Sequence, residues 1–441
     1  MIRRILGVIR RYPSVGVSAA MIAVLIGLSI YTLIALPLPK ALSMWRAERD
    51  VWKYTPANAR PAWTNLLRQE KLPITFIIPT READTVTEPL NETLSSQTMR
   101  LLFTYDNTHL PSEVVFFFNV RIGSKIPLLT IHWIRPDGME VELRSGPANP
   151  GPARELIDPS AVFGAVDQHK LTIGTGSFGG DGDEEVLPGE HMLVIKALAF
   201  DEGFALDGEL VVYGRVHGLA GTDTRRRDLT IGLLWGTPIA LMFGLIAAVG
   251  TTLLGFVIAA VGAWYGGWID AVIQRLTEIN MMIPFLPTIM MVGWFFSSSL
   301  WILLTFIIGF SILTGRLKSY RAMFLQLIRA EYVEAARAYG ASGPRIIFRY
   351  LIPRVFPVLL PHIILGVPMF VFLETSLAFI GISDPNLITW GSVLSDASGV
   401  LYMRSYYWIL GPMLLLMFTG ISFSVLGYTL ERAFNPLLRD R

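Results

Sequence analysis

The 441-residue chain contains no cysteine, which excludes disulfide bonds, thiol catalysis and cysteine-ligated metal sites. Charged residues are scarce as well, because they make up 16% of the chain whereas 52% of its residues are hydrophobic. Together with a mean hydropathy of +0.49, this balance is rare among soluble globular domains. The sequence therefore indicates a membrane protein, in which any part outside the bilayer is stabilised by its own core.

The sequence lacks several features that indicate ATP binding, nucleic-acid binding or catalysis. No Gly-x-x-x-x-Gly-Lys-Ser/Thr phosphate loop occurs, so we do not expect this chain to bind ATP itself. The net charge of +2 argues against a nucleic-acid surface, which needs a large basic excess on one face. No nucleophile with its base is recognisable, so no catalytic residue is assigned and an enzyme is not expected.

A metal site is not expected either. The run from Gly179 to Glu185 carries several carboxylates, as calcium prefers, but its spacing does not match an EF-hand and favours a solvated loop. The histidines outside the membrane fall at no metal-ligand spacing: they are His109, His132, His169, His191 and His217. We predict that this chain binds no metal and no cofactor.

The N-terminal region, residues 1–39, predicts a cytoplasmic start and a first membrane span. Four arginines lie within the first eleven residues, and an uncharged run from Tyr12 to Pro39 follows, long enough to cross a bilayer. The basic flank places the N-terminus in the cytoplasm. A cleaved signal peptide is the alternative, but this run is longer than its usual apolar region and ends without a small-x-small cleavage site.

Residues 40–218 have the composition of a soluble domain. A helical lead-in is predicted over 41–53 and 59–71. Alternating β-rich runs then predict strands over 74–78, 99–104, 113–122, 128–134, 140–143, 191–199 and 209–216. The turn Pro136-Asp137-Gly138 predicts a hairpin. We expect a β-rich, sandwich-like extracytoplasmic domain, because the span before it leaves the cytoplasm.

Residues 219–441 carry the remaining apolar runs. After an interfacial lead-in helix, spans are predicted over 238–263, 271–296, 300–320, 355–382 and 406–428. The loop 319–354 is assigned to the cytoplasm, since residues 316–354 contain eight basic residues against two acidic ones. The chain is therefore expected to be an α-helical integral membrane protein with six transmembrane helices and both termini in the cytoplasm.

The stretch from Ala330 to Pro353 is a charged segment between apolar ones. It predicts two short helices, the first with Tyr332, Ala335, Ala336 and Tyr339 on one face and Glu331, Glu334 and Arg337 toward another. The hinge is expected at Gly340, where a left-handed residue is tolerated. Ser342 and Pro344 suit the start of the second helix, and Pro353 is expected to interrupt it before the next span.

These residues resemble a family motif. Glu334-Ala335-Ala336, followed by Gly340 and Pro353, resembles the EAA motif of ABC-importer permeases, and YVEAARAYGAS with RIIFRYLIP resembles its dipeptide and oligopeptide branch, apart from Tyr350 at a usually aliphatic position. The resemblance implies that this loop couples the permease to cytoplasmic ATPases.

Further motifs extend the resemblance. The segment from His217 to Asp228 is similar to the H-x-x-G-T-D-x-x-G-R-D signature before the second span; it matches at Gly221, Thr222, Asp223, Arg227 and Asp228, has one extra residue after His217 and has Arg226 at the family's glycine. Residues 373–381 resemble the E-x-S-L-x-F-L-G pattern, and Trp390-Gly391 its W-G element.

Glu374 is a carboxylate in an otherwise uncharged stretch, where the bilayer penalises a charge by about 2.5–3.5 kcal/mol. It is expected to face protein or water. Two roles stay open for it, namely a residue of the translocation path or gate, or a structural hydrogen-bonding role.

The resemblance implies the fold of a type I ABC-importer permease in the plasma (inner) membrane of a prokaryote. It implies a second homologous permease, two ATPases that hold ATP and Mg, and an extracytoplasmic binding protein that delivers peptides. Nickel, glutathione or a glycopeptide are alternative cargoes. A membrane-anchored sensor would not need six spans, and a secondary transporter would show repeated halves. The large insert has no counterpart in the resemblance, and we expect it to dock the binding protein, cap the pore mouth or support assembly.

Overall fold

The computed structural model describes residues 13–46, 51–91, 94–123, 125–164, 186–200, 204–399 and 407–434. The chain divides into two compact units. The helical unit is built from the described parts of Met1–Arg46, Ile231–Leu401 and Ile409–Arg441. The β unit is built from the described parts of Ala47–Thr230 and Tyr402–Trp408.

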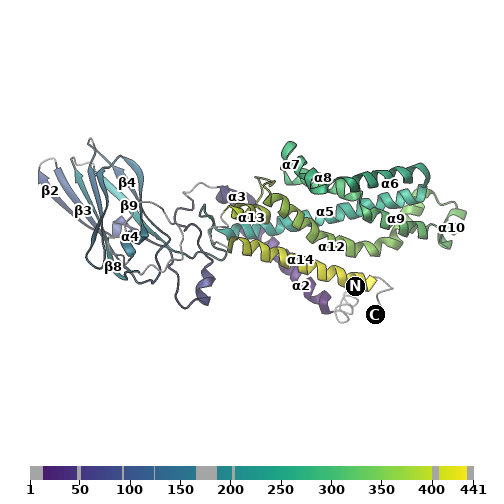
Figure 1. The fold of residues 1–441 in the computed structure, drawn as a ribbon, viewed down its shortest axis with the longest axis horizontal. Helices are drawn as coiled ribbons and strands as arrows, with labels where there is room; N and C mark the ends of the chain where they lie inside the picture. The colour runs from purple at the N-terminus through teal and green to yellow at the C-terminus, as the bar shows by residue number, and fades with distance from the viewer. Residues whose placement is uncertain are drawn as a thin grey trace. The chain divides into compact units, whose positions relative to one another are not determined.

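The β unit is an antiparallel sandwich, in agreement with the alternation in its sequence (Figure 1). One sheet has the order β1-β9-β4-β7, with β1 Phe76–Pro79, β9 Ala205–Tyr213, β4 Glu113–Arg121 and β7 Gly151–Ile157. The other has the order β2-β3-β8-β5-β6, with β2 Asp84–Asn91, β3 Leu94–Tyr105, β8 Gly189–Ala199, β5 Leu128–Ile134 and β6 Glu140–Pro147. Phe116 and Leu210 of the first sheet and Trp133 and Ile195 of the second share one hydrophobic core.

Most strands of this unit were predictable, but two were not. The seven predicted runs correspond to strands, and the hairpin at Pro136-Asp137-Gly138 is confirmed, with Gly138 at a φ of +82°. The strands β2, with the sequence DTVTEPLN, and β7, with the sequence GPARELI, were missed because each contains charged residues and a proline, which a strand tolerates at a sheet edge. The helical lead-in is shorter than predicted, since α3 covers Leu38–Arg46 and the 3-10 helix η1 covers Ala62–Leu67.

The helical unit contains the apolar helices (Figure 1). Their bounds are α2 Pro13–Ala35, α5 Leu229–Tyr265, α6 Gly267–Met282, α7 Phe285–Phe295, α8 Leu300–Ile312, α9 Gly315–Leu327, α12 Ile352–Phe379 and α14 Tyr407–Phe434. Shorter helices are α10 Glu331–Ala338, α11 Gly343–Ile346 and α13 Trp390–Ser398, and α4 Pro159–Phe163 belongs to the β unit. In the described part of the chain, 4 helices are long and apolar enough to cross a membrane, or up to 6 if each bent pair is one span.

The second apolar helix is continuous, whereas a separate lead-in helix was predicted. Helix α5 runs through 37 residues although Pro238 has no N–H to offer the carbonyl of Leu234. The hydroxyl of Thr32 in α2 lies 2.8 Å from the carbonyl of Leu28 and 3.3 Å from that of Leu234, and shares its hydrogen between them. The freed carbonyl therefore keeps a donor from a neighbouring helix, and the helix does not have to end.

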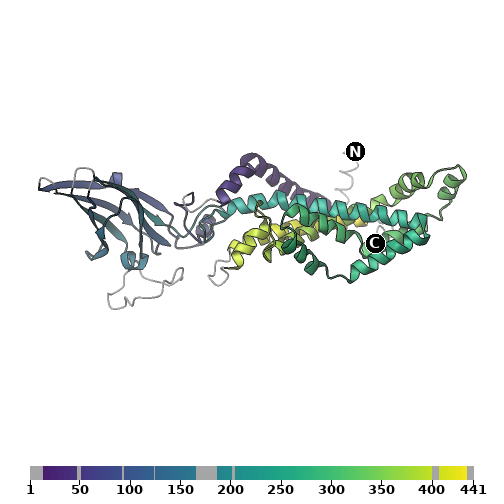
Figure 2. The ribbon, with the colours of Figure 1, turned by 90° about the horizontal axis from the view of Figure 1, so that it is seen from above.

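The third and fourth predicted spans are each broken. Helices α6 and α7 meet at 82° after Ile283-Pro284, and α8 and α9 meet at 48°. Figure 2 shows α6 to α9 along one side of the bundle. The amide of Asn280 donates to the carbonyls of Phe310 and Leu313, both at 2.8 Å. One side chain from the first break thus satisfies the carbonyls that the second break leaves free.

Pro353 does not interrupt the chain, so that expectation was wrong. The helix runs from Gly343 to Phe379, and a π-helical turn over Ile347–Leu351 precedes the proline. Pro353 is the second residue after this turn, and a local π-helical adjustment lets a membrane helix continue through a proline.

Candidate functional site

Helix α10, which the sequence motif marks as a candidate coupling helix, is anchored by one face and exposed on the other. Val333 and Ala336 are buried and pack in a cluster with Phe324 of α9 and Leu351 before α12. Glu334 and Ala335 are exposed, and Tyr339 is 92% exposed. The predicted face was therefore partly wrong, because Ala336 turns inward while Tyr332 and Ala335 stay outside. The outer side of the helix is therefore exposed, whereas its inner side holds it to α9 and to the segment before α12.

The hinge after α10 has the predicted backbone. Gly340 has a φ of +78°, and a Cβ built on it would meet nothing within 4 Å. Ser342 occupies the N-cap position of α11 without a side-chain capping hydrogen bond, and Pro344 lies in the first turn of that helix. The guanidinium of Arg337 stacks at 4.4 Å over the ring of Trp264, which fixes the end of α10.

A cavity of about 740 Å³ opens between α5, the bent pairs and α12. Its walls are largely apolar, with Met369, Phe372 and Phe310 among them. Polar groups come from Asn280 at the helix breaks and from Arg316 and Tyr320 of α9, together with Thr251 and Ser376. A concave, mainly apolar space with a few polar groups is typical of a small-molecule site or path.

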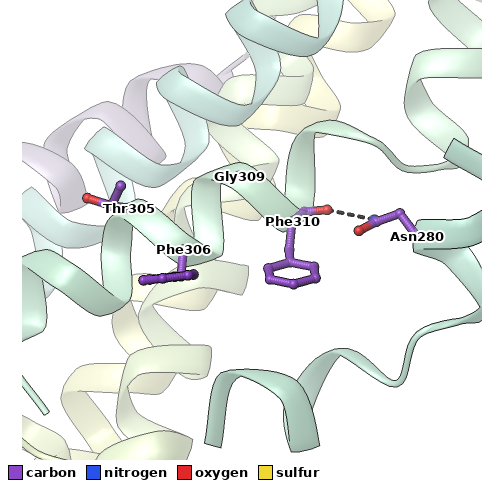
Figure 3. A pocket seen from close by; sticks show the side chains of 5 residues that line it. All are labelled: Asn280, Thr305, Phe306, Gly309 and Phe310. Carbon is purple, nitrogen blue, oxygen red and sulfur yellow. Dashed lines mark hydrogen bonds between the residues drawn. The ribbon is translucent and has the colours of Figure 1, made fainter. Parts of the chain in front are cut away.

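A smaller cavity of about 250 Å³ lies beside it (Figure 3). It is lined by Asn280, Thr305, Phe306, Gly309 and Phe310, and it shares Asn280 and Phe310 with the larger one. In Figure 3 the amide of Asn280 points at the carbonyl of Phe310, across the space between the two broken helices. Asn280 was not among the predicted site residues, although the sequence shows an amide in an apolar run shortly before Pro284.

Glu374 is buried, 3% exposed, at the contact between α12 and α13. Its carboxylate accepts hydrogen bonds from the hydroxyls of Thr375, at 3.4 Å, and Thr389. Thr389 is also the N-cap of α13, where it accepts from the N–H of Ser392 at 3.1 Å. Glu374 is not among the residues that line the larger cavity, whereas its neighbours Leu373 and Ser376 are.

The W-G element, Trp390-Gly391, packs at the same contact between α12 and α13. The indole of Trp390 donates to the carbonyl of Leu233 in α5 at 3.0 Å, and Gly236 leaves room for the indole ring, since a Cβ there would overlap it. Gly391 lies against Thr375 and Ala378 of α12, where a Cβ would come within 2.9 Å of the Thr375 Cα. The two motifs that lie apart in the sequence therefore form one packed joint of α5, α12 and α13.

The motif before α5 is a stem within the β unit, and the structure brings its predicted residues together. Thr222 is fully buried; its hydroxyl accepts from the N–H of Ala59 at 2.9 Å and donates to the carbonyl of Pro56 at 2.6 Å. Gly221 has a φ of +80°, and a Cβ there would overlap the carbonyl of Ala59. The segment at Pro56 and Ala59 is therefore hydrogen-bonded to the segment at Thr222 that leads into α5.

The rest of this stem is held by ionic contacts. Asp223 accepts from the backbone N–H of Arg227 at 2.7 Å and forms an ion pair with its guanidinium. Asp228 accepts from the N–H of Thr230 at 2.8 Å at the start of α5.

Arg226, at the glycine of the family pattern, has a φ of +67°. It stacks over Tyr213 at 4.2 Å and pairs with Glu113, so that its side chain binds both β9 and β4.

The described residues contain no group of three His, Cys, Asp or Glu side chains that could hold a metal ion. The acidic run 179–185 and His169 lie outside the described residues. Trp133 donates to Nδ1 of His191 at 3.2 Å, and Nε2 of that ring lies 3.2 Å from the carbonyl of Leu187. Burial lowers the pKa of His191, as expected for a neutral core histidine.

Residues 232–440 match the family model described as the inner membrane component of binding-protein-dependent transport systems. The oligopeptide transport system permease protein OppC of Escherichia coli (strain K12) is 32% identical over 223 residues, which are 50% of this chain and 72% of the relative. The dipeptide transport system permease protein DppC of Bacillus subtilis is 28% identical over 222 residues, 50% of this chain and 68% of the relative.

A third relative has a different name. The peptidoglycan transport system permease protein YejE of Agrobacterium fabrum is 33% identical over 168 residues, 37% of this chain and 43% of the relative. The family match begins after the β unit, at the helix that carries Gly236. The chain belongs to the family of inner membrane components of binding-protein-dependent transport systems.

Proposed function

We propose that this chain is the permease subunit of an ATP-driven importer for peptides. The observation that carries the proposal is an exposed coupling helix packed against the same helices that line the cavity. In the proposal, two ATPases that hold ATP and Mg dock on α10, a second homologous permease completes the path, and an extracytoplasmic binding protein delivers the peptide. The relatives named as dipeptide and oligopeptide permeases support peptides as cargo.

The packing of α10 suggests how ATPase movement reaches the path. Glu334, Ala335 and Tyr339 form the exposed docking side, and Val333 packs in the cluster that contains Phe324 and Leu351. Phe324 belongs to α9, which also carries Arg316 and Tyr320 of the cavity wall. A displacement of α10 would therefore move α9 and α12, because packed helices shift as bodies.

We also propose six spans, with each bent pair crossing once, and with both termini and the loop 319–354 in the cytoplasm. The excess of basic residues in that loop supports this orientation. The β unit then lies on the extracytoplasmic side, between the first and second spans. Such a position suits contact with an arriving binding protein.

For Glu374 we propose a gate role as a positioning residue. Helix α12 starts at the coupling loop, and Glu374 lies in its last turns, at the other end. There its carboxylate holds Thr389, the N-cap of α13, so that α13 stays docked over this end of α12 and α5. These hydrogen bonds satisfy the polar atoms of the buried carboxyl group.

Reconstitution tests the transport function directly. The chain, its partner permease, the two ATPases and the binding protein would be assembled in proteoliposomes and supplied with labelled di- and oligopeptides. Uptake that requires ATP and the Glu334 surface supports the proposal. The proposal is contradicted if the assembly takes up none of the peptides and yet hydrolyses ATP when nickel, glutathione or a glycopeptide is added.

A muropeptide-like glycopeptide is the second candidate cargo, favoured by the relative named as a peptidoglycan transport permease. A competition assay tests this second cargo. Unlabelled glycopeptide should reduce the uptake of labelled peptide only if both use the same path.

The role of the β unit can be tested by a deletion that keeps the stem contacts of Thr222 and Asp223 but removes Tyr213 and Glu113, the partners of Arg226. The N–H of Gly214 donates to the hydroxyl of Thr75 at 3.0 Å, and the N–H of Arg215 donates to the carbonyl of Pro73 at 2.9 Å. Replacing residues 76–213 by a short Gly/Ser linker therefore joins two points that are already adjacent. If the sandwich docks the binding protein, this deletion assembles but loses stimulation of ATPase activity; full stimulation contradicts docking, and lost assembly favours a structural role.

A further inference from the structure

The β unit carries an exposed apolar protrusion, which we call the apolar tip and define as Trp63, Leu66, Leu67 and Leu219. These side chains are 50%, 86%, 80% and 73% exposed. Three belong to η1 and the fourth to the stem before α5. In Figure 1, η1 is the short unlabelled helix, in blue-purple, that projects away from the strands. Contiguous exposed apolar side chains of this size mark an interaction site on a folded protein.

Hydrogen bonds hold the apolar tip in place. The indole of Trp63 donates to the carbonyl of Leu219 at 3.0 Å, and the N–H of Ala62 donates to the carbonyl of Gly218 at 2.9 Å. The side chain of Asn65 donates to the carbonyl of Leu72 at 3.0 Å and accepts from its N–H at 3.1 Å. In a 3-10 helix, residues three apart share a face, so Trp63 and Leu66 point the same way. The exposure is therefore built into the fold.

The apolar tip lies beside the start of a membrane helix. The N–H of Leu229, the first residue of α5, donates to the carbonyl of Gly221 at 3.0 Å, and Gly221 is the second residue after Leu219. From Leu229 to Ile269 the chain contains no charged residue. The tenth residue after Leu219 is therefore the first residue of a helix that enters the lipid bilayer.

Charges around the apolar tip suit a lipid surface. Arg68 follows the leucines directly, Lys71 lies three residues further along, and both are exposed. The acid between them, Glu70, accepts a hydrogen bond from Thr108 at 3.1 Å and lies 3.7 Å from Nε2 of His109. Tryptophan, leucine and flanking cations together are the composition of segments that lie in the headgroup region of a bilayer.

We propose that the apolar tip inserts into the lipid headgroup region and anchors the β unit to the bilayer. The side chains of Leu66 and Leu67 reach about 5–10 Å into the boundary between headgroups and acyl chains, as other interfacial segments do. Arg68 and Lys71 then lie at the level of anionic headgroups. A bilayer contact here fixes the orientation of the sandwich through the stem that continues into α5.

A single-cysteine experiment tests this proposal on the full chain, which has no cysteine of its own. Leu67→Cys is labelled with an environment-sensitive dye and placed in nanodiscs of phosphatidylcholine with phosphatidylglycerol. Leu102→Cys in β3 and Leu156→Cys in β7 are matched controls, since these leucines are 56% and 59% exposed on the sandwich. The label at residue 67 should shift to the blue and be quenched by brominated lipids, while both control labels stay in water.

The cations Arg68 and Lys71 allow a second test. Arg68→Glu with Lys71→Glu should reduce quenching of the label at residue 67 in nanodiscs with phosphatidylglycerol and change it little in phosphatidylcholine alone. Leu219→Cys repeats the measurement from the stem, in case the label disturbs η1. Labels at residues 67 and 219 that stay in water would overturn the proposal. A blue shift without quenching by brominated lipid would also overturn it, because a protein surface would then cover the tip.

Discussion

The hydroxyl of Thr32 in α2 lies 3.3 Å from the carbonyl of Leu234 in α5, the carbonyl that Pro238 leaves without its helical donor. Thr32 is fully buried and shares its hydrogen with the carbonyl of Leu28. A hydrogen bond between helices thus replaces one that the proline removes from within a helix. This contact lets a proline remain in a continuous membrane helix.

Removing the hydroxyl should therefore destabilise the packing of α2 on α5. We expect Thr32→Val to cost about 1 kcal/mol, as for other hydrogen bonds between membrane helices. On a Pro238→Ala background the same change should cost less, because residue 238 then donates to Leu234 itself. Thermal unfolding of the four variants in detergent measures this double-mutant cycle. Equal costs on both backgrounds would show that Thr32 does not serve the freed carbonyl.

A second prediction concerns the hinge after the coupling helix. Because a Cβ at Gly340 would meet nothing, a substitution there acts through the φ of +78° alone. Gly340→Val should cost about 1–2 kcal/mol locally and misplace α10. Gly340→Asn is the matched control, since asparagine tolerates this conformation better. We expect ATPase association and coupled uptake to fall in the order Gly, Asn, Val; unchanged values for the valine variant would remove the hinge from the coupling mechanism.

The third prediction separates the two roles left open for Glu374. If its carboxylate positions α13 through Thr389, then Glu374→Leu and Thr389→Val should lower uptake of acidic, neutral and basic peptides by a similar factor. Each variant removes one partner of the same buried contact, so combining them should add little. Uptake assays across peptide charges measure this. A loss confined to peptides of one charge would instead place Glu374 in the translocation path.

Those structural features that depend on residues close together in the sequence were predictable from the sequence. The core strands were predictable because alternation of apolar residues, as in Leu193, Ile195 and Ala197, sets which side faces the core. The left-handed hinge at Gly340 was predictable because a glycine there ends a helix. Both depend on neighbours in the sequence.

The parts that were not predictable depend on distant partners. Pro238 and Pro353 read as helix breakers, yet Thr32 serves the carbonyl freed by the first, and a π-helical turn precedes the second. The bends in the third and fourth spans depend on the amide of Asn280, which reaches carbonyls about thirty residues further along the chain. In the stem, Thr222 was recognised from its motif, but its partners lie more than 160 residues earlier.

The last prediction concerns the pH dependence of the β unit. His191 is fully buried, and its ring lies 4.6 Å from that of Phe163. Burial is the largest cause that lowers its pKa below the ordinary 6.5; the carbonyl of Leu187 and Asp137 oppose the shift, and Arg135 adds to it. The neutral ring accepts from Trp133 through Nδ1, so a proton on that nitrogen would face another N–H. The folded state therefore disfavours the charged form.

The direction of the pH effect on stability follows from the lowered pKa of His191. Because the folded pKa lies below the unfolded one, the unfolded chain binds the proton more readily, and stability present above about pH 6.5 is lost as the pH falls. The unfolding temperature of the β unit, followed by circular dichroism, should thus decrease on acidification. In His191→Gln, whose amide can make both hydrogen bonds without titrating, this decrease should be smaller. An identical pH profile for His191→Gln and the unmodified chain would assign the acid sensitivity to another group.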